Sequence, residues 1–205
     1  MPEFLALSLI VLLFSVIVHE VRHGLAALHY GDETAQKMGR LTLNPIPHID
    51  PVGTILFPAL LMITGSPILF GWAKPVPINP LNFSNLRRGE LVVSSAGILA
   101  NFGLAFLAAV LFHIFSILPQ TPTLLLQLLR YSVTINLILG VFNLFPIPPL
   151  DGSKVLLSQL PYNLAKEYAR LEQYGFLLLI MLLFTGIPQA LMGFLVGILS
   201  KLLGF

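Results

Sequence analysis

The chain has 205 residues, of which 56% are hydrophobic and 10% charged, and its formal net charge is +2. A soluble domain is ordinarily about a quarter charged, so too few polar side chains remain here to cover a surface that faces water. The composition therefore excludes an ordinary soluble domain and predicts a protein that lies in the lipid bilayer. The small net charge gives no support to nucleic-acid binding. The lack of cysteine excludes disulfides, thiolate ligands and a cysteine nucleophile.

Five long apolar stretches predict an all-α polytopic membrane protein with about five to six transmembrane helices. The stretches cover residues 4–30, 52–64, 91–118, 123–145 and 176–205. A helix that crosses the hydrocarbon core needs about 20 residues, so the second stretch is short for a full crossing. The last stretch is interrupted at Gly186-Ile187-Pro188 and can form two short spans or one hairpin. The first stretch has no basic residue before it and no small-residue cleavage site after it, so we expect a span rather than a cleaved signal peptide.

Two proline-rich segments, residues 41–51 and 71–80, lie between the first and third stretches. Proline is incompatible with a helix interior, yet both segments are too apolar for ordinary loops. Non-helical backbone at membrane depth is tolerated only where it is buried in protein or lines a wet cavity. We therefore expect a re-entrant, partly extended hairpin near residues 40–85.

Basic residues predict the orientation of the chain. Eight of the eleven lysines and arginines lie in segments 31–50, 65–90 and 151–172, whereas the connections at 119–122 and 186–189 carry none. By the positive-inside rule, the first set of segments is cytoplasmic and the second external, which places the N-terminus outside. This assignment requires residues 45–85 to enter and leave on the same side, a second argument for the re-entrant hairpin.

The domain organisation follows from the lack of any polar linker. We expect a single domain over residues 1–205. Within it we distinguish a core at 4–160 and a C-terminal helical hairpin at 173–205. No internal repeat is convincing.

The first apolar stretch contains His19-Glu20-Val21-Arg22-His23, which matches the pattern H-E-x-x-H. On a helix, residues four apart lie about 40° from each other, so both imidazoles can face one metal ion. Glu20 lies about 100° from His19 and can reach a water beside the ion, which suits a general base. Ionisable groups in a membrane helix cost roughly 2.5–3.5 kcal/mol each, and a zinc ion would compensate for them. The alternative is a histidine pair satisfied by neighbouring helices or a water-filled cavity.

Catalytic zinc normally takes three protein ligands, so a third must come from elsewhere. The candidates are His29, Asp50, Glu90 and Asp151. On an unbroken helix His29 points about 240° away from His23, which argues against it. Asp50 is better suited to capping or turning its proline-rich segment.

Asp151 follows the fourth stretch on the side that the basic residues mark as cytoplasmic, and the first stretch carries His19 and His23 toward that side. Both motifs therefore approach the same depth, as a shared metal requires. The preceding prolines end the helix, and we expect Gly152 to permit a turn that aims the Asp151 carboxylate inward. The alternative is an ordinary turn aspartate before a glycine.

Taken together, these motifs resemble those of the site-2 protease family of intramembrane zinc metalloproteases, in its compact form without a PDZ or CBS module. The matching pieces are His19 to His23, residues 41–51, Gly71 to Pro77, Ser95 to Asn101 and Asn143 to Gly152. The resemblance implies one zinc ion per chain, with His19, His23 and Asp151 as its ligands. It implies Glu20 as the catalytic carboxylate and Asn143 as a catalytic residue near the scissile carbonyl. Asn101 matches a core-helix motif of the family, with interhelical hydrogen bonding as the alternative to a substrate role.

The resemblance also implies a biological setting. The protein would be a multi-pass protein of a prokaryotic cell membrane, with its active site facing the cytoplasmic side. Its partners would be the lipid bilayer and the transmembrane segments of other membrane proteins, which it would hydrolyse in regulated intramembrane proteolysis. We expect no nucleic-acid partner, and the oligomeric state is open, a homo-oligomer included.

Two positions depart from the family pattern. Arg22 stands before the second histidine where a small residue is usual, and Ile98 follows Gly97 where proline is usual. Arg22 motivates an alternative function, a catalytically impaired membrane scaffold or binding protein of the same fold. A transporter or metal permease is a third interpretation, but the third and last stretches lack the polar row that it needs.

Overall fold

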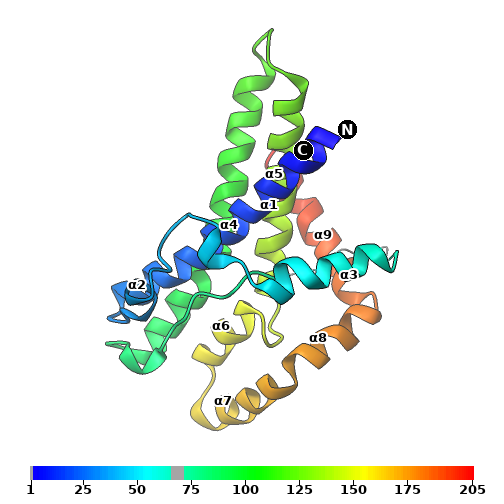
Figure 1. Cartoon of the computed structure of the whole chain (residues 1–205). Helices are drawn as coiled ribbons and strands as arrows, with labels where there is room; N and C mark the ends of the chain where they lie inside the picture. Colours follow the sequence, from blue (N-terminus) through cyan, green and yellow to red (C-terminus); the bar gives the residue numbers. More distant parts are fainter. Residues whose placement is uncertain (1, 66–71) are drawn as a thin grey trace.

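The computed structural model describes residues 2–65 and 72–205, and within these ranges the chain is helical and has no β-strand (Figure 1). The main helices are α1 (Pro2–His29), α2 (Thr34–Lys37), α3 (Phe57–Ile63), α4 (Leu86–Ser116), α5 (Thr123–Leu144), α6 (Asp151–Gln159), α7 (Tyr162–Ala169), α8 (Gly175–Phe184) and α9 (Ile187–Leu202). Short 3-10 helices cover Ile46–His48, Pro80–Asn82 and Arg170–Tyr174, and a π-helix covers Pro51–Leu56. The all-α prediction is confirmed.

In the described ranges, three helices are long and apolar enough to cross a membrane, namely α1, α4 and α5. They coincide with the first, third and fourth apolar stretches of the sequence. The last stretch forms α8 and α9, and the helical run that ends with α8 is bent by 78° against α9. Counted as one broken span, this pair raises the number to four. The structure supports a membrane protein, and the higher count of five to six spans stays a prediction.

Local chemistry sets the helix ends. The Asn85 side chain accepts a hydrogen bond from the backbone N–H of Arg88 and caps α4. Pro122 precedes α5. Proline lacks a backbone N–H, which costs nothing here because the first N–H groups of a helix have no partner inside the helix. Gly186 separates α8 from α9 with a φ of 75°, a left-handed conformation that glycine adopts without strain.

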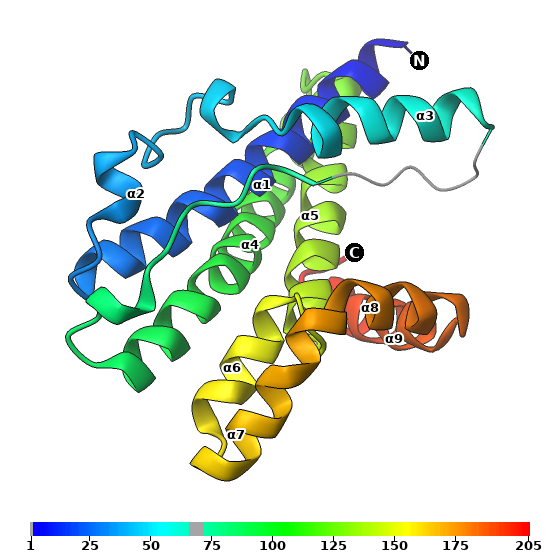
Figure 2. The same ribbon diagram turned by 60° about the horizontal axis from the view of Figure 1, so that its bottom comes forward.

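The centre of the protein is the packing of α1 with α4 and α5 (Figure 2). Three alanines of α4 are buried against α5, and α9 covers part of the same cluster. The buried members are Ala105, Ala108, Ala109, Val133 and Leu137. Small residues let helix backbones approach closely, which is how helices associate when lipid offers no hydrophobic driving force.

The predicted hairpin has one helical arm and one extended arm. The outgoing arm is the π-helix and α3, and the returning arm, residues 72–79, is extended and lies beside the start of the outgoing arm (Figure 2). The backbone N–H groups of Trp72 and Lys74 donate to the carbonyls of Gly53 and His48, at 3.1 and 2.9 Å. Residues 66–71 lie outside the described ranges. Entry of this hairpin into the bilayer remains a prediction.

A buried carboxylate fastens the end of α1 to the segment before α4. Asp32 is fully buried, and its oxygens accept hydrogen bonds from the backbone N–H groups of Thr34 and Asn79 and from the Asn82 amide. Asp32 was not predicted from the sequence to have such a role. Its bonds fix the returning arm of the hairpin relative to α1, and that arm passes beside the site described next.

Candidate metal centre

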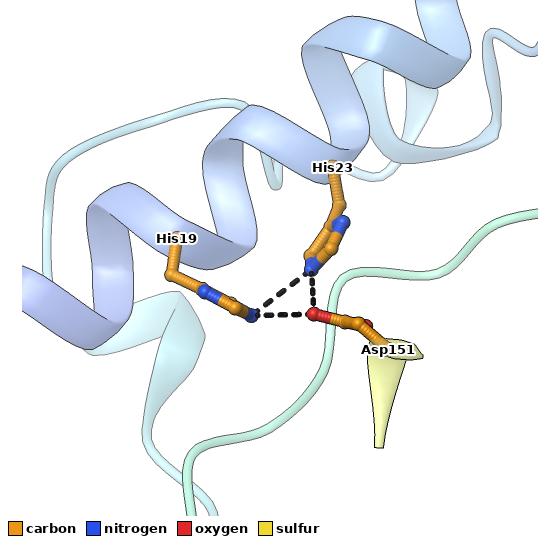
Figure 3. A group of neighbouring side chains, drawn as sticks. All are labelled: His19, His23 and Asp151. Atoms are coloured by element: carbon orange, nitrogen blue, oxygen red, sulfur yellow. Dashed lines mark hydrogen bonds and ion pairs between the residues drawn. The ribbon is translucent and has the colours of Figure 1, made fainter. Parts of the chain in front are cut away.

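Three side chains converge where α1 passes the start of α6. Figure 3 shows the imidazoles of His19 and His23, both on α1, pointing toward the carboxylate of Asp151, the first residue of α6. Oδ2 of Asp151 lies 3.1 Å from Nε2 of each histidine, and the two Nε2 atoms lie 3.0 Å apart. Both histidines are buried, and the Asp151 side chain is 13% exposed. The two motifs that the sequence places at one depth therefore meet in space.

Hydrogen bonds behind the rings determine which nitrogen faces the centre. Nδ1 of His19 lies 2.7 Å from Oδ1 of Asn101, and Nδ1 of His23 lies 2.6 Å from the backbone carbonyl of Val93. Both partners are acceptors, so each Nδ1 carries the ring proton. In a neutral imidazole the other nitrogen then has a free lone pair. Both Nε2 lone pairs therefore point into the centre.

The centre thus holds three electron-pair donors and no proton between them while the imidazoles are neutral. Oδ2 of Asp151 is a buried oxygen without a hydrogen-bond donor. A buried acceptor without a donor is costly, and three in mutual contact repel one another. A cation in the middle removes this repulsion, and these residues form a group able to hold a metal ion.

The spacing of the three atoms suits zinc. In a tetrahedral site with metal–ligand bonds of about 2.0–2.2 Å, neighbouring ligand atoms lie about 3.3–3.6 Å apart. The observed separations of 3.0–3.1 Å are shorter than this by about 0.2–0.6 Å, so a small outward shift of the ligand atoms would admit the ion. Two imidazoles and one carboxylate, with Nδ1–H groups held by oxygen acceptors, are also the donor set and support that catalytic zinc uses.

Helix α4 is shaped to fit this pair of histidines. Its contacts with them recur at four-residue spacing, from Val93 through Gly97 to Asn101, and run in the opposite order to His19 and His23. The two helices are therefore antiparallel here. A Cβ atom on Gly97 would lie 2.4 Å from Nε2 of His23, so only glycine allows the backbone of α4 this close to the rings.

The expectation that Gly152 permits a turn at Asp151 is wrong. Asp151 and Gly152 do not form a turn, because they begin α6, and Gly152 has no positive φ. A Cβ atom on Gly152 would lie 2.2 Å from the backbone oxygen of Leu144. The glycine is needed because the start of α6 packs directly on the end of α5. This contact, rather than a left-handed turn, sets the position of the Asp151 carboxylate.

Glu20 is half-buried, and the returning arm of the hairpin contacts it. Its Oε2 accepts a 2.8 Å hydrogen bond from the backbone N–H of Val76. The buried Arg40 holds the same arm, because its Nη2 donates to the carbonyls of Lys74 and Pro75 at 2.8 and 3.2 Å. The carboxylate expected to act as base therefore has a fixed backbone partner.

The remaining candidate residues lie elsewhere. The Asp50 side chain accepts from the backbone N–H groups of Val52 and Gly53, which confirms its expected capping role. His29 is exposed and packs edge-on against Tyr30. The group of possible metal ligands found in the described ranges includes neither of them, nor Glu90.

The roles expected of Asn143 and Arg22 remain predictions. Asn143 is half-buried in the last turn of α5, and its amide donates to the carbonyl of Leu139 in its own helix. Arg22 is exposed, and it makes no hydrogen bond or ion pair in the described part of the chain. The three converging ligand atoms come from other residues, so Arg22 does not occupy the centre.

The groups that support the site were not predicted from the sequence. They include the Val93 carbonyl, the Val76 N–H and the fully buried Asn136, which binds the Asn101 amide. Backbone donors and acceptors have no sequence signature. Asn136 carried a usable signal, because it is a polar amide within a stretch long and apolar enough to cross a membrane, where a polar side chain needs a partner.

A buried His-His-Asp cluster on an H-E-x-x-H helix, set among apolar helices, defines a membrane protein of the metallopeptidase class. Peptidase family M50 matches the chain over residues 120–185. A protein of Bacillus subtilis (strain 168) named "Putative zinc metalloprotease YwhC" is 39% identical over 181 residues, 86% of this chain and 79% of that protein. The chain belongs to peptidase family M50, the site-2 protease family.

A second relative is longer than this chain. "Putative zinc metalloprotease Rip2" of Mycolicibacterium smegmatis is 30% identical over 173 residues, which cover 84% of this chain and 64% of that protein. A third, "Putative zinc metalloprotease MJ0611" of Methanocaldococcus jannaschii, is 42% identical over 64 residues, 31% of each chain. No solved structure matches the chain.

Proposed function

We propose that the protein is an intramembrane zinc metalloprotease that hydrolyses peptide bonds in the transmembrane segments of other membrane proteins. The observation that carries the proposal is the contact of three lone-pair atoms, from His19, His23 and Asp151, within 3.1 Å of one another in a buried place. Family membership and the names of the relatives support the same activity.

His19, His23 and Asp151 would hold one zinc ion per chain. When bound, the ion supplies Lewis acidity to water and to the peptide carbonyl. Glu20 takes the proton of the attacking water and delivers it to the leaving amine. The Val76 N–H supports this role, because a carboxylate with one oxygen bonded keeps the other oriented.

We assign Asn143 the stabilisation of the oxyanion that forms on the scissile carbonyl. Its amide donates only within its own helix, so a side-chain rotation would free it for a substrate. The substrate is a membrane-spanning helix whose backbone bonds are satisfied internally, and it must unwind locally before attack. The site faces the cytoplasmic side, where water enters, by the positive-inside rule.

The test uses the full chain purified in detergent and returned to liposomes with a model transmembrane substrate. We expect about one zinc per chain by elemental analysis and cleavage of the substrate. Glu20→Gln should keep the zinc and lose cleavage, whereas Asp151→Ala should lose both. Equal cleavage by wild type and Glu20→Gln would refute the protease function. The alternative function, a membrane scaffold of the same fold, would then be favoured.

A further inference from the structure

A relay of buried amides leads from the candidate metal centre into the interface of α1, α4 and α5. Oδ1 of Asn101 accepts from Nδ1 of His19 at 2.7 Å, and its Nδ2 donates to Oδ1 of Asn136 at 2.9 Å. Nδ2 of Asn136 then donates to Oγ of Ser15 at 2.9 Å. Both asparagines are 0% exposed and Ser15 is 2% exposed, so water takes no part in these bonds.

The far end of the relay fixes its direction. Nδ2 of Asn136 also donates to the backbone carbonyl of Ser132 at 2.9 Å, and a carbonyl can only accept. The hydroxyl of Ser15 gives its proton to the carbonyl of Val11 at 2.8 Å, so it offers only lone pairs to Asn136. The amide of Asn136 must therefore turn its NH₂ toward Ser15 and its oxygen toward Asn101.

The orientation of Asn136 passes to the metal centre. Because Asn136 presents an oxygen, Asn101 must present its NH₂ there and its own oxygen to His19. An oxygen at Nδ1 requires the ring proton on that nitrogen, which leaves the Nε2 lone pair facing Asp151. A reversed relay would place the proton on Nε2, where it blocks a metal.

We propose that Asn136 is a positioning residue that, acting through Asn101, selects the metal-binding tautomer of His19 and so sets the zinc affinity of the centre. The inference rests on the proposed function. It assigns a task to a residue of α5 that does not touch the centre. Polar partners behind metal ligands typically change metal affinity by about 10- to 100-fold, and buried helices offer no water to replace a lost bond.

The affinity test compares two neighbouring buried residues of α5 in the full chain. Asn136→Leu removes the amide and keeps the branching and the number of non-hydrogen side-chain atoms. Leu137→Ala is the matched control, because Leu137 is 2% exposed and packs in the core of α4 and α5 but has no place in the relay. In a zinc competition against a chelator of known affinity, we expect Asn136→Leu to bind about 10- to 100-fold more weakly. Leu137→Ala should stay within a few-fold of wild type.

A spectroscopic test detects the tautomer itself. The imidazole nitrogen NMR spectrum of zinc-free protein should show His19 protonated on Nδ1 in wild type and Leu137→Ala, with its signal assigned through the His19→Gln variant. In Asn136→Leu we expect a mixture of tautomers. If that variant does not fold, Ser15→Ala removes one of the two acceptors that orient the Asn136 NH₂. Because the Ser132 carbonyl remains, we expect a smaller share of the second tautomer and a smaller loss of affinity.

Two outcomes distinguish a failure of the Asn136 relay from a failure of the proposed function. An Asn136→Leu protein with wild-type zinc affinity and a single His19 tautomer overturns the relay while the metal site stands. A wild-type protein that takes up no zinc in the competition, with the fold intact, overturns the proposed function itself.

Discussion

The backbone N–H of Val76 donates a 2.8 Å hydrogen bond to Oε2 of Glu20. The bond joins the extended arm of the hairpin to the helix that carries both histidines. Arg40 holds the preceding carbonyls and Asp32 accepts from the N–H of Asn79, so the arm is fixed on both sides of Val76. The hairpin therefore contacts Glu20 through its backbone. Substitutions that keep the backbone N–H of residue 76 leave this hydrogen bond in place.

Replacing Val76 by proline removes this donor with little change of shape, because prolines 75 and 77 already favour an extended backbone. We expect Val76→Pro to keep its zinc and to cleave a model substrate about tenfold more slowly. That factor corresponds to a hydrogen bond to a charged group worth about 1.5 kcal/mol. The measurement is the initial cleavage rate at equal zinc content.

Val76→Ala is the matched control, since it shortens the side chain and keeps the N–H. It should cleave at nearly the wild-type rate. Faster cleavage by Val76→Pro would contradict the prediction and would indicate that the arm restrains Glu20.

Two glycines of α4 offer a paired test of close packing. A Cβ atom on Gly97 would lie 2.4 Å from Nε2 of His23 and 2.6 Å from Cε1 of His19, whereas one on Gly103 meets nothing within 4 Å. Gly97→Ala should therefore weaken zinc binding at least tenfold, because overpacking costs about 1–3 kcal/mol. Gly103→Ala should leave zinc binding unchanged. Chelator competition on both variants, with thermal unfolding alongside, checks the pair.

The buried Asp32 predicts a pH-dependent contribution to stability. Burial alone would raise its pKa, but hydrogen bonds from Thr34, Asn79 and Asn82 outweigh burial and hold the pKa below the ordinary value. A carboxyl whose pKa is lower when folded stabilises the protein above the unfolded pKa of about 3.9 and loses this effect as the pH falls through the folded pKa.

We therefore expect Asp32→Asn to lower the free energy of unfolding by about 1–3 kcal/mol at pH 7, since its NH₂ would face another donor. The difference from wild type should narrow below about pH 4. Glu33→Gln is the control, because Glu33 is exposed and forms a surface ion pair with Lys37. Thermal unfolding between pH 3 and pH 7 measures both variants. A loss that is constant over this range contradicts the prediction.

Arg22 is the residue that departs most from the family pattern, and its exposed position predicts a small effect on the metal. Arg22→Gln should bind zinc within about threefold of wild type, because a long arginine side chain extends its charge to the membrane interface, where water and salt screen it. Substrate cleavage should persist. A gain of tenfold or more in zinc affinity would show that Arg22 repels the ion.

The long apolar helices and the break in the last stretch could be predicted because each depends on local chemistry. The span from 123 to 145 became α5, and the break at Gly186 became the bend between α8 and α9. The convergence of Asp151 with the histidines followed from charge placement, which puts both motifs at one depth. Peptidase-family membership followed from the order of the motifs.

The support of the site could not be predicted, because it depends on tertiary contacts. The reason for Gly152 is the carbonyl of Leu144, and the partner of Glu20 is a backbone N–H more than fifty residues away. The helical outgoing arm of the hairpin was also unexpected. Its proline at position 51 suggested an irregular chain, but Asp50 caps a helical turn that begins there.

The three converging residues are synthesised at different times. Both imidazoles and their α4 partners belong to the first 101 residues, while the carboxylate comes from residue 151. A ribosome must therefore finish the α4–α5 hairpin before the last ligand exists. The three ligand atoms therefore cannot come together before synthesis has passed residue 151.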